Sequence, residues 1–284
     1  MSSVAIDEAL VRRLVAEQFP QWQDETVEQV LPGGHDNRTF RLGRELSVRL
    51  PSAETYAAHV GVEHEWLPRL RAQLSLPTPE IVGTGSPCKT FPWPWTVLRW
   101  LPGQPLGDAA ADREPLAVDL AAFLVELRSL PCVGGPLAGR HNFHRGGDLA
   151  VYDAQTREQV SLLLSEDLRR GAVELWEAAL DARDEGLRTW IHGDVAAGNL
   201  LFEDGRLAAV IDFGQLAVGD PSCDYVAAWT VFSGRSRELF RSAADVDEAT
   251  WTRARGWALW KELLQVDAAT PAPSAHLLDL LSAA

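Results

Sequence analysis

The chain has 284 residues, of which 46% are hydrophobic, and its formal net charge at pH 7 is −14. This charge argues against nucleic acid or an anionic membrane as a partner, and no apolar run is long enough to span a bilayer. The charge suits a cationic acceptor and, equally well, simple solubility. The N-terminus lacks a signal-peptide pattern and the three cysteines form no disulfide framework, so we expect a cytoplasmic protein with no obligate protein partner.

The chain begins with an expected helix followed by a hairpin. Residues 5–19 carry apolar side chains at helical spacing, and residues 26–31 and 39–42 are predicted strands. The turn between the strands, residues 32–37, contains Gly33 and Gly34. Taken alone, this glycine pair indicates a hairpin turn. A strand–turn–strand unit can also place backbone N–H groups over the phosphates of a nucleotide, and we keep both interpretations.

Residues 46–50 are the next predicted strand, with Arg49 on its polar face. In the helix expected after Pro51, Glu63 falls in an otherwise apolar stripe. A glutamate in such a stripe needs a partner, and we expect Arg49 to be that partner. Glu65 is the second candidate, but its spacing turns it away. The alternative for Arg49 is a surface arginine on an exposed strand.

The boundaries of this helix follow from local signals. Ser52 is the expected N-terminal cap, and Pro68 is expected to kink or end the helix. Residues 79–83 and 94–100 are further predicted strands, and residues 99–103 are expected to close the sheet. From Pro102 onward the pattern is helical, with one buried stripe at Leu116, Leu120, Phe123, Leu124, Leu127 and Leu130.

The later segments are predicted mainly as helices. Residues 131–147 form a glycine-rich loop, in which His141 and His144 are interpreted as surface residues rather than metal ligands. Two helices are expected within residues 153–186, one within 223–232, and more toward the C-terminus. Trp251, Trp257 and Trp260 are interpreted as core residues, with a wall of an acceptor pocket as the alternative.

The stretch from Trp190 to Asp224 carries the chemistry. Its polar residues Asp194, Asn199 and Asp212 stand among short apolar runs, two of which are predicted strands. The Asp204-Gly205 pair between these strands is a strong signal for a tight hairpin. We therefore expect Asn199, before the first strand, to come close to Asp212, after the second.

This set suits phosphoryl transfer from a nucleotide. A carboxylate must orient the attacking hydroxyl and accept its proton, and oxygen ligands must hold Mg²⁺ against the phosphates. Asp194 suits the role of base, while Asn199 and Asp212 suit the role of metal ligands. The spacing His-x-Asp-x-x-x-x-Asn, followed by Asp-Phe-Gly, is that of the catalytic and metal loops of protein kinases.

The sequences His192-Gly193-Asp194 and Gly219-Asp220-Pro221-Ser222-Cys223-Asp224 resemble the aminoglycoside phosphotransferase family. The resemblance implies a bilobal, protein-kinase-like α+β fold with a cleft between the lobes. Residues 1–100 would form the sheet-rich nucleotide-binding lobe, and residues 101–284 the larger, helical, acceptor-binding lobe. Asp220 is expected to cap or stabilise the metal loop, and Asp224 and His192 are expected to be structural.

Two nucleotide contacts follow from the resemblance. Kinase-like folds place a lysine where this chain has Arg49, so we expect Arg49 to hold the phosphates and to pair with Glu63. The backbone of Arg99, Trp100 and Leu101 is expected to bond the nucleotide base, which leaves ATP and GTP equally open.

The expected function is nucleotide- and Mg²⁺-dependent O-phosphorylation of a small molecule. The resemblance implies an antibiotic acceptor, an aminoglycoside or a macrolide, and hence antibiotic resistance. One alternative is a metabolite kinase acting on choline, a sugar or an amino alcohol. The other is a nucleotide-binding protein with little catalysis, which the arginine at position 49 would suit.

Overall fold

The computed structural model describes residues 5–31, 33–107, 113–267 and 272–282. The chain divides into two compact units. One comprises Met1–Pro102 with Ala209–Gly214, and the other comprises Gly103–Ala208 with Gln215–Ala284. The first unit is therefore built from two separate stretches of sequence.

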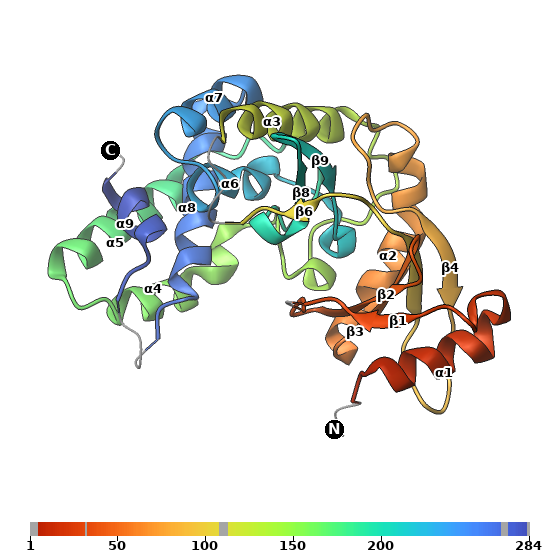
Figure 1. Ribbon diagram of the computed structural model, residues 1–284. Helices are drawn as coiled ribbons and strands as arrows, with labels where there is room; N and C mark the ends of the chain where they lie inside the picture. The colour runs from red at the N-terminus through yellow and green to blue at the C-terminus, as the bar shows by residue number, and fades with distance from the viewer. Residues whose placement is uncertain (1–4, 32, 108–112, 268–271, 283–284) are drawn as a thin grey trace. The chain divides into compact units, whose positions relative to one another are not determined.

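The first unit is a five-stranded antiparallel sheet with two helices (Figure 1). Its strands follow the order β1-β2-β3-β5-β4, with bounds β1 Val27–Gln29, β2 Asn37–Leu42, β3 Leu46–Pro51, β4 Ile81–Gly85 and β5 Trp95–Arg99. The helices are α1, Glu8–Gln18, and α2, Glu54–Arg71. The apolar stripe of α1 packs in one buried cluster with strand residues such as Phe40, Val48 and Trp95.

The expected N-cap of α2 was wrong, and so was the alternative that α2 ends at Pro68. Its N-cap is Ala53, whose methyl side chain cannot accept a hydrogen bond. The Ser52 hydroxyl does not cap the helix and donates instead to the carbonyl of His35 at 2.8 Å. The helix also continues through Pro68 to Arg71. Leu67 and Leu70, on either side of the proline, are both buried, and this packing outweighs the hydrogen bond that proline removes.

The second unit is mainly helical (Figure 1). Its α-helices among the described residues are α3 Glu114–Ser129, α4 Asp153–Ser161, α5 Glu166–Asp181, α6 Ala227–Thr230, α7 Gly234–Ala244, α8 Glu248–Leu263 and α9 Ala275–Ser282. The predicted stripe of α3 is buried, except that Leu130 caps the helix and is only half-buried. Helix α8 packs against α5 and α9, and its tryptophans Trp251, Trp257 and Trp260 are buried.

The helix expected from Cys223 to Phe232 was wrong in its extent. A tight 3-10 segment, Pro221–Val226, precedes the short helix α6. Asp220 caps this segment by accepting from the Ser222 N–H at 3.1 Å. Asp224 within it bonds two backbone N–H groups of another loop, at residues 192 and 193. These tertiary bonds favour the tighter backbone over a regular α-helix.

Two small sheets contain the strands of the stretch from Trp190 to Asp224. Strands β7, Thr189–Ile191, and β10, Ala217–Gly219, pair antiparallel. The other sheet has the order β6-β8-β9, with bounds β6 Gln104–Pro105, β8 Leu200–Glu203 and β9 Arg206–Val210. Asp204 and Gly205 both have left-handed φ angles, 49° and 80°, so the hairpin predicted from the Asp-Gly pair is confirmed. Among the described residues, the helices are too short or too polar to cross a membrane.

Candidate active site

In the first unit, Arg49 of β3 lies between two carboxylates. It forms a buried ion pair with Glu63 of α2, and its Nη1 lies 3.4 Å from Oδ1 of Asp212. Arg49 is 8% exposed and Glu63 2%, so the strand arginine is not a surface residue. The glutamate that interrupts the apolar stripe of α2 faces the strand cation directly.

Burial and charge act against each other at this pair. Burial lowers the pKa of Arg49, but the carboxylates of Glu63 and Asp212 outweigh it and raise that pKa above its usual value. Burial also raises the pKa of Glu63, which the charge of Arg49 opposes. The arginine therefore remains a cation at any working pH, and it is the partner that keeps a carboxylate tolerable in this buried position.

Asp212 follows β9 in a strained backbone conformation. Its φ is 65°, in the left-handed region that aspartate tolerates better than most residues. The N–H of Val210, two residues earlier, donates to the carbonyl of Pro77 at 3.2 Å and anchors the turn within the first unit. The side chain of Asp212 is 33% exposed, so its carboxylate can serve both Arg49 and a ligand.

In the second unit, Asp224 clamps the loop that carries Asp194. Its two carboxylate oxygens accept from the N–H groups of His192 at 2.7 Å and Gly193 at 2.8 Å. The N–H of Asp194 then donates to Nδ1 of His192 at 3.2 Å. Gly193 has a φ of 80°, and any Cβ there would collide with the carbonyl of Gln215. The loop backbone is thus fixed on both sides before Asp194.

The carboxylate of Asp194 contacts an amide on one oxygen and a cation on the other. Asn199 Nδ2 lies 3.2 Å from Oδ2 and also donates to the Asp194 carbonyl at 2.9 Å. Lys261 of α8 lies 3.2 Å from Oδ1. Burial alone would raise the pKa of Asp194, but the charges of Lys261, Arg145 and His192 outweigh it and lower that pKa. The carboxylate is therefore ionised at neutral pH.

Sequence reasoning missed Lys261 and Arg145. Lys261 is one of only two lysines, and it follows the buried Trp260 in α8. A lone lysine on a helix rich in buried residues was the signal available. Arg145 lies in the glycine-rich loop of residues 131–147, and no pattern in that loop marks it out. Neither residue belongs to a local motif with Asp194, since the contact depends on helices from distant segments.

Among the described residues, the others predicted to contact the nucleotide form no hydrogen bond or ion pair with the side chains above. Gly33 and Gly34 are exposed in the turn between β1 and β2, while Pro32 lies outside the described residues. The N–H groups of Arg99 and Trp100 already donate to the carbonyls of Glu80 and Glu45, at 2.9 and 2.7 Å. Their contact with a nucleotide base stays a prediction.

Asp220 is a structural residue. Besides capping the 3-10 segment, it receives Nε and Nη2 of Arg253 on its two oxygens, at 2.7 and 3.1 Å. Both side chains are buried, at 5% and 10% exposure. The bidentate pair ties α8 to the segment that carries Asp224.

Asn199 and Asp212 each offer an oxygen donor of the kind that Mg²⁺ prefers. The amide nitrogen of Asn199 is turned to Asp194, which leaves its oxygen for a metal. Asp212 offers a partly exposed carboxylate. Hard oxygen donors of this kind fit Mg²⁺, which usually takes few protein ligands and keeps several waters. Within the described residues, no three His, Cys, Asp or Glu side chains gather as a metal site.

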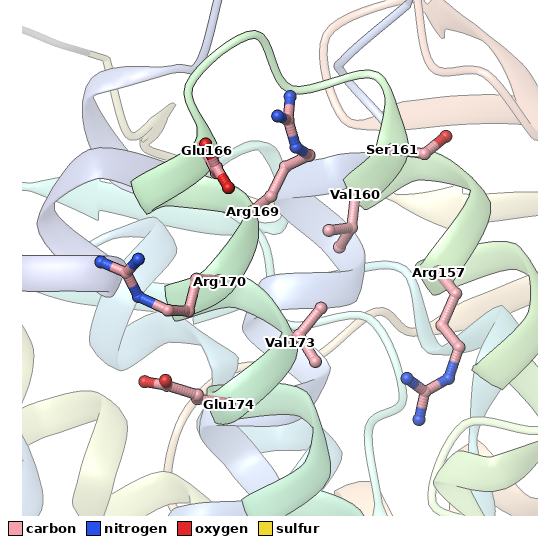
Figure 2. A pocket seen from close by; sticks show the side chains of 8 residues that line it. All are labelled: Arg157, Val160, Ser161, Glu166, Arg169, Arg170, Val173 and Glu174. Carbon is pink, nitrogen blue, oxygen red and sulfur yellow. The ribbon is translucent and has the colours of Figure 1, made fainter.

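A hollow of about 560 Å³ lies between α4 and α5 of the second unit, and neither Asn199 nor Asp194 is among the residues that line it (Figure 2). Its arginines are already engaged. Arg157 pairs with Asp153 and Glu177, and Arg170 pairs with Asp167. Arg169 donates to the carbonyls of Leu163 and Leu164. With these cations satisfied, the hollow offers no catalytic group comparable to Asp194.

A sheet-rich unit with a buried Arg–Glu pair and a helical unit with a clamped aspartate loop define a kinase-like α+β protein. The sequence profile of the phosphotransferase enzyme family matches residues 27–257. The chain therefore belongs to this family, and the expected phosphotransferase activity is confirmed at that level. None of the curated proteins compared with the chain matches it in sequence.

Solved structures agree in fold. The GDP and kanamycin complex of APH(2″)-IIia is 23% identical, with 89% of each chain covered and a TM-score of 0.74. Wild-type aminoglycoside 2′-phosphotransferase-IIIa with GDP is 21% identical over 97% of each chain, with a TM-score of 0.76. The apoenzyme of macrolide 2′-phosphotransferase MphH from Brachybacterium faecium is 20% identical over 97% of each chain, with a TM-score of 0.63. These similarities confirm the expected fold class.

Proposed function

We propose that this phosphotransferase transfers the terminal phosphoryl group of ATP or GTP to a hydroxyl group of a small molecule in the cytoplasm. The observation that carries the proposal is the environment of Asp194. It is an ionised carboxylate, oriented by Asn199 and Lys261, on a loop whose backbone is clamped by Asp224. A nucleotide-binding protein without catalysis has no need of such a preorganised carboxylate.

In the proposed reaction, Asp194 accepts a hydrogen bond from the acceptor hydroxyl and orients its oxygen toward the terminal phosphorus. The new P–O bond forms as the bond to the leaving nucleoside diphosphate breaks, and the hydroxyl proton passes to Asp194. A carboxylate with a lowered pKa is a weak base. It suits a transition state in which little proton transfer has occurred when the P–O bonds change.

The other residues act on charge and position. Arg49, held by Glu63, would bind the phosphates of the nucleotide with its guanidinium fork. Asn199 and Asp212 would hold Mg²⁺, which neutralises phosphate charge. His192 positions the loop through its bond from the Asp194 N–H.

The names of the neighbours supply candidate acceptors. They include aminoglycoside phosphotransferases, one in a complex with kanamycin, and a macrolide phosphotransferase. Phosphorylation of an antibiotic, with resistance as its consequence, is therefore the first hypothesis to test. A kinase of a small metabolite is the second hypothesis, and among such metabolites the cations beside Asp194 favour a neutral or anionic one over choline or an amino alcohol.

The test is nucleoside diphosphate release with ATP and with GTP, across kanamycin, a macrolide, choline and simple sugars. Asp194→Asn should retain nucleotide affinity and lower turnover by roughly 10²–10⁴-fold, the usual worth of a positioned acid–base group. Asp204→Asn is a matched control, because this exposed aspartate lies in the β8–β9 turn. Equal turnover of the two variants would reject the role of Asp194.

A further inference from the structure

Arg145 forms no ion pair with a carboxylate in the part of the chain that the structure describes, although its charge acts on Asp194. Its guanidinium carbon lies 4.3 Å from the centre of the Trp260 ring. Among the described residues it makes no ion pair, and its buried Nε has no hydrogen-bond partner. Lys261 and Arg253 of the same unit, by contrast, are paired with Asp194 and Asp220. A buried donor left unpaired costs stability, so the Arg145 guanidinium retains capacity for a further hydrogen-bond partner.

The backbone holds Arg145 firmly. Asn142 is fully buried, and its amide nitrogen donates to the Arg145 carbonyl at 2.9 Å, while the Arg145 N–H donates to the Asn142 carbonyl at 3.1 Å. The next residue, Gly146, accepts from the Asp220 N–H at 2.7 Å and has a left-handed φ of 71°. Arg145 is thus presented by a rigid loop, and little entropy would be lost when it binds a ligand.

The Arg145 guanidinium packs on a buried aromatic residue, since Trp260 is only 4% exposed. The Trp260 ring stacks on Tyr152 with 4.3 Å between centroids, and its Nε1 donates to Gln155 at 3.0 Å. Trp260 immediately precedes Lys261, the residue that contacts Asp194. The charge of Arg145 is also close enough to lower the pKa of Asp194. Arg145 and the Trp260 ring beneath it therefore belong to the surroundings of the catalytic carboxylate.

The local charge opposes a polycationic acceptor. Asp194 contributes one negative charge, and Lys261 and Arg145 contribute two positive charges. Of two carboxylates on neighbouring segments, Asp153 is paired with Arg157, while Glu262 accepts from the Ser274 hydroxyl and keeps its charge. An ammonium group approaching Asp194 would meet two cations in a partly desolvated site, where like charges repel strongly.

We propose that the acceptor carries a carboxylate near the hydroxyl that is phosphorylated, and that Arg145 binds this carboxylate. The inference rests on the proposed function, because it concerns the acceptor of the Asp194 site. The acceptor class is a hydroxy acid or a sugar acid. An arginine fork matches a carboxylate with two parallel N–H donors.

The experiment uses matched acceptors that differ in charge: glucuronate, glucose and glucosamine, extended by gluconate, glycerate and kanamycin. Nucleoside diphosphate release is measured for the wild type, Arg145→Gln, Arg145→Lys and Arg140→Gln. Arg140 is the control, an exposed arginine of the same loop. For a carboxylate acceptor we expect Arg145→Gln to raise KM roughly 10- to 100-fold, the worth of a hydrogen-bonded charged pair. The KM for glucose should change little, and Arg145→Lys should recover part of the loss.

Calorimetric binding of the same carboxylates to the nucleotide-loaded protein supplies a second readout. Binding that Arg145→Gln abolishes and Arg140→Gln retains supports the proposal even where turnover is slow. Absence of Arg145-dependent binding for all three carboxylates overturns it. Preferred turnover of kanamycin or glucosamine also overturns it, while Asp194-dependent transfer to them keeps the proposed function intact.

The effect on kcat shows whether Arg145 acts on the acceptor or on the phosphoryl group that is transferred. If Arg145→Gln lowers kcat equally for charged and neutral acceptors, Arg145 acts on the transferred phosphoryl group, and the carboxylate assignment is wrong. If no compound is phosphorylated but the carboxylates bind through Arg145, the proposed function fails and the binding site stands. The two failures are therefore distinguishable.

Discussion

Lys261 Nζ lies 3.2 Å from Oδ1 of Asp194, while Asn199 approaches Oδ2 of the same carboxylate. The lysine comes from α8 and the aspartate from the clamped loop after β7. This contact sets both the orientation and the charge of the proposed base. It also determines how the enzyme should respond to pH.

Lys261→Met should lower kcat by roughly 10- to 100-fold, because Asp194 loses a charged hydrogen bond worth about 1.5–3 kcal/mol. The pKa of Asp194 should rise, since burial remains and its strongest opposing charge is gone. A carboxylate must be ionised to accept the proton, so the acid limb of the kcat–pH profile should move to higher pH. Steady-state kinetics between pH 4.5 and 8 measure both effects.

Lys89→Met is the matched control, because Lys89 is the other lysine and lies in the first unit. It should leave the profile unchanged. A Lys261→Met enzyme with reduced kcat but an unshifted acid limb would show that the lysine positions Asp194 without setting its charge.

The effects of replacing Arg49 and Glu63 on stability should be non-additive. Arg49→Ala leaves a buried carboxylate without its cation, and breaking a buried pair in this way costs about 3–5 kcal/mol. Glu63→Ala should also destabilise the protein, and the double variant should be less destabilised than the sum of the two. Urea unfolding of the wild type, the two single variants and the double variant gives the coupling free energy. The KM for the nucleotide, measured for the same four proteins, shows whether the pair is also coupled in function.

The exposed pair Arg188–Asp184 provides the contrast for this cycle, with its atoms 2.7 Å apart at the surface. Its coupling should be small, since solvent screens such pairs. Additive losses at Arg49 and Glu63 would mean that each residue acts separately.

Asp212→Asn tests the metal role without disturbing the backbone, because asparagine also tolerates the left-handed φ of 65°. We expect the variant to bind nucleotide more weakly than the wild type when Mg²⁺ is present. With a chelator the difference should vanish or reverse, since a negative charge near the phosphates is gone. Calorimetry under both conditions provides the measurement, with Asp204→Asn as control. Equal weakening in both conditions would assign Asp212 a structural role.

Asp119 should make stability depend on pH. Its carboxylate accepts from Arg206 Nε at 2.7 Å and from the Leu207 N–H at 3.2 Å, which joins α3 to β9. The hydrogen bonds from Arg206 lower its pKa from the usual value near 3.8, against the opposing effect of burial. The stabilisation is therefore present above pH 4 and lost as pH falls through the lowered pKa.

We expect Asp119→Asn to have a Tm lower than wild type by about 2–4 °C at pH 7, the usual effect of one such interaction in a chain of this size. The difference should shrink as the pH falls below 4. A difference that persists unchanged at pH 2.5 would attribute the loss to packing rather than to charge.

Local sequence patterns predicted the features that depend on residues close together in the sequence. The helical stripe identified Glu63 as the misplaced charge of α2, and its buried partner is Arg49. The Asp204-Gly205 pair predicted the hairpin because both residues accept a positive φ. Two local signals gave wrong boundaries for α2. Ser52 bonds to the carbonyl of His35 instead of capping the helix, and the burial of Leu67 and Leu70 carries the helix through Pro68.

The surroundings of Asp194 could not be predicted in the same way. Asp224 and Lys261 reach it from segments with their own periodicities, and no spacing rule connects them. Arg145 depends further on the burial of Asn142, which fixes its loop. Such contacts are decided by how helices pack, whereas motifs record only the residues that do the chemistry.

The discontinuity of the first unit also has a consequence for biosynthesis. Ala209–Gly214 belongs to that unit, and with it Asp212 and the Val210 bond to Pro77. A ribosome must therefore translate more than a hundred further residues after Pro102 before Arg49 can meet its second carboxylate. Nascent chains stalled before residue 209 should consequently expose the first unit in an incomplete form, which chaperones would have to protect during that interval.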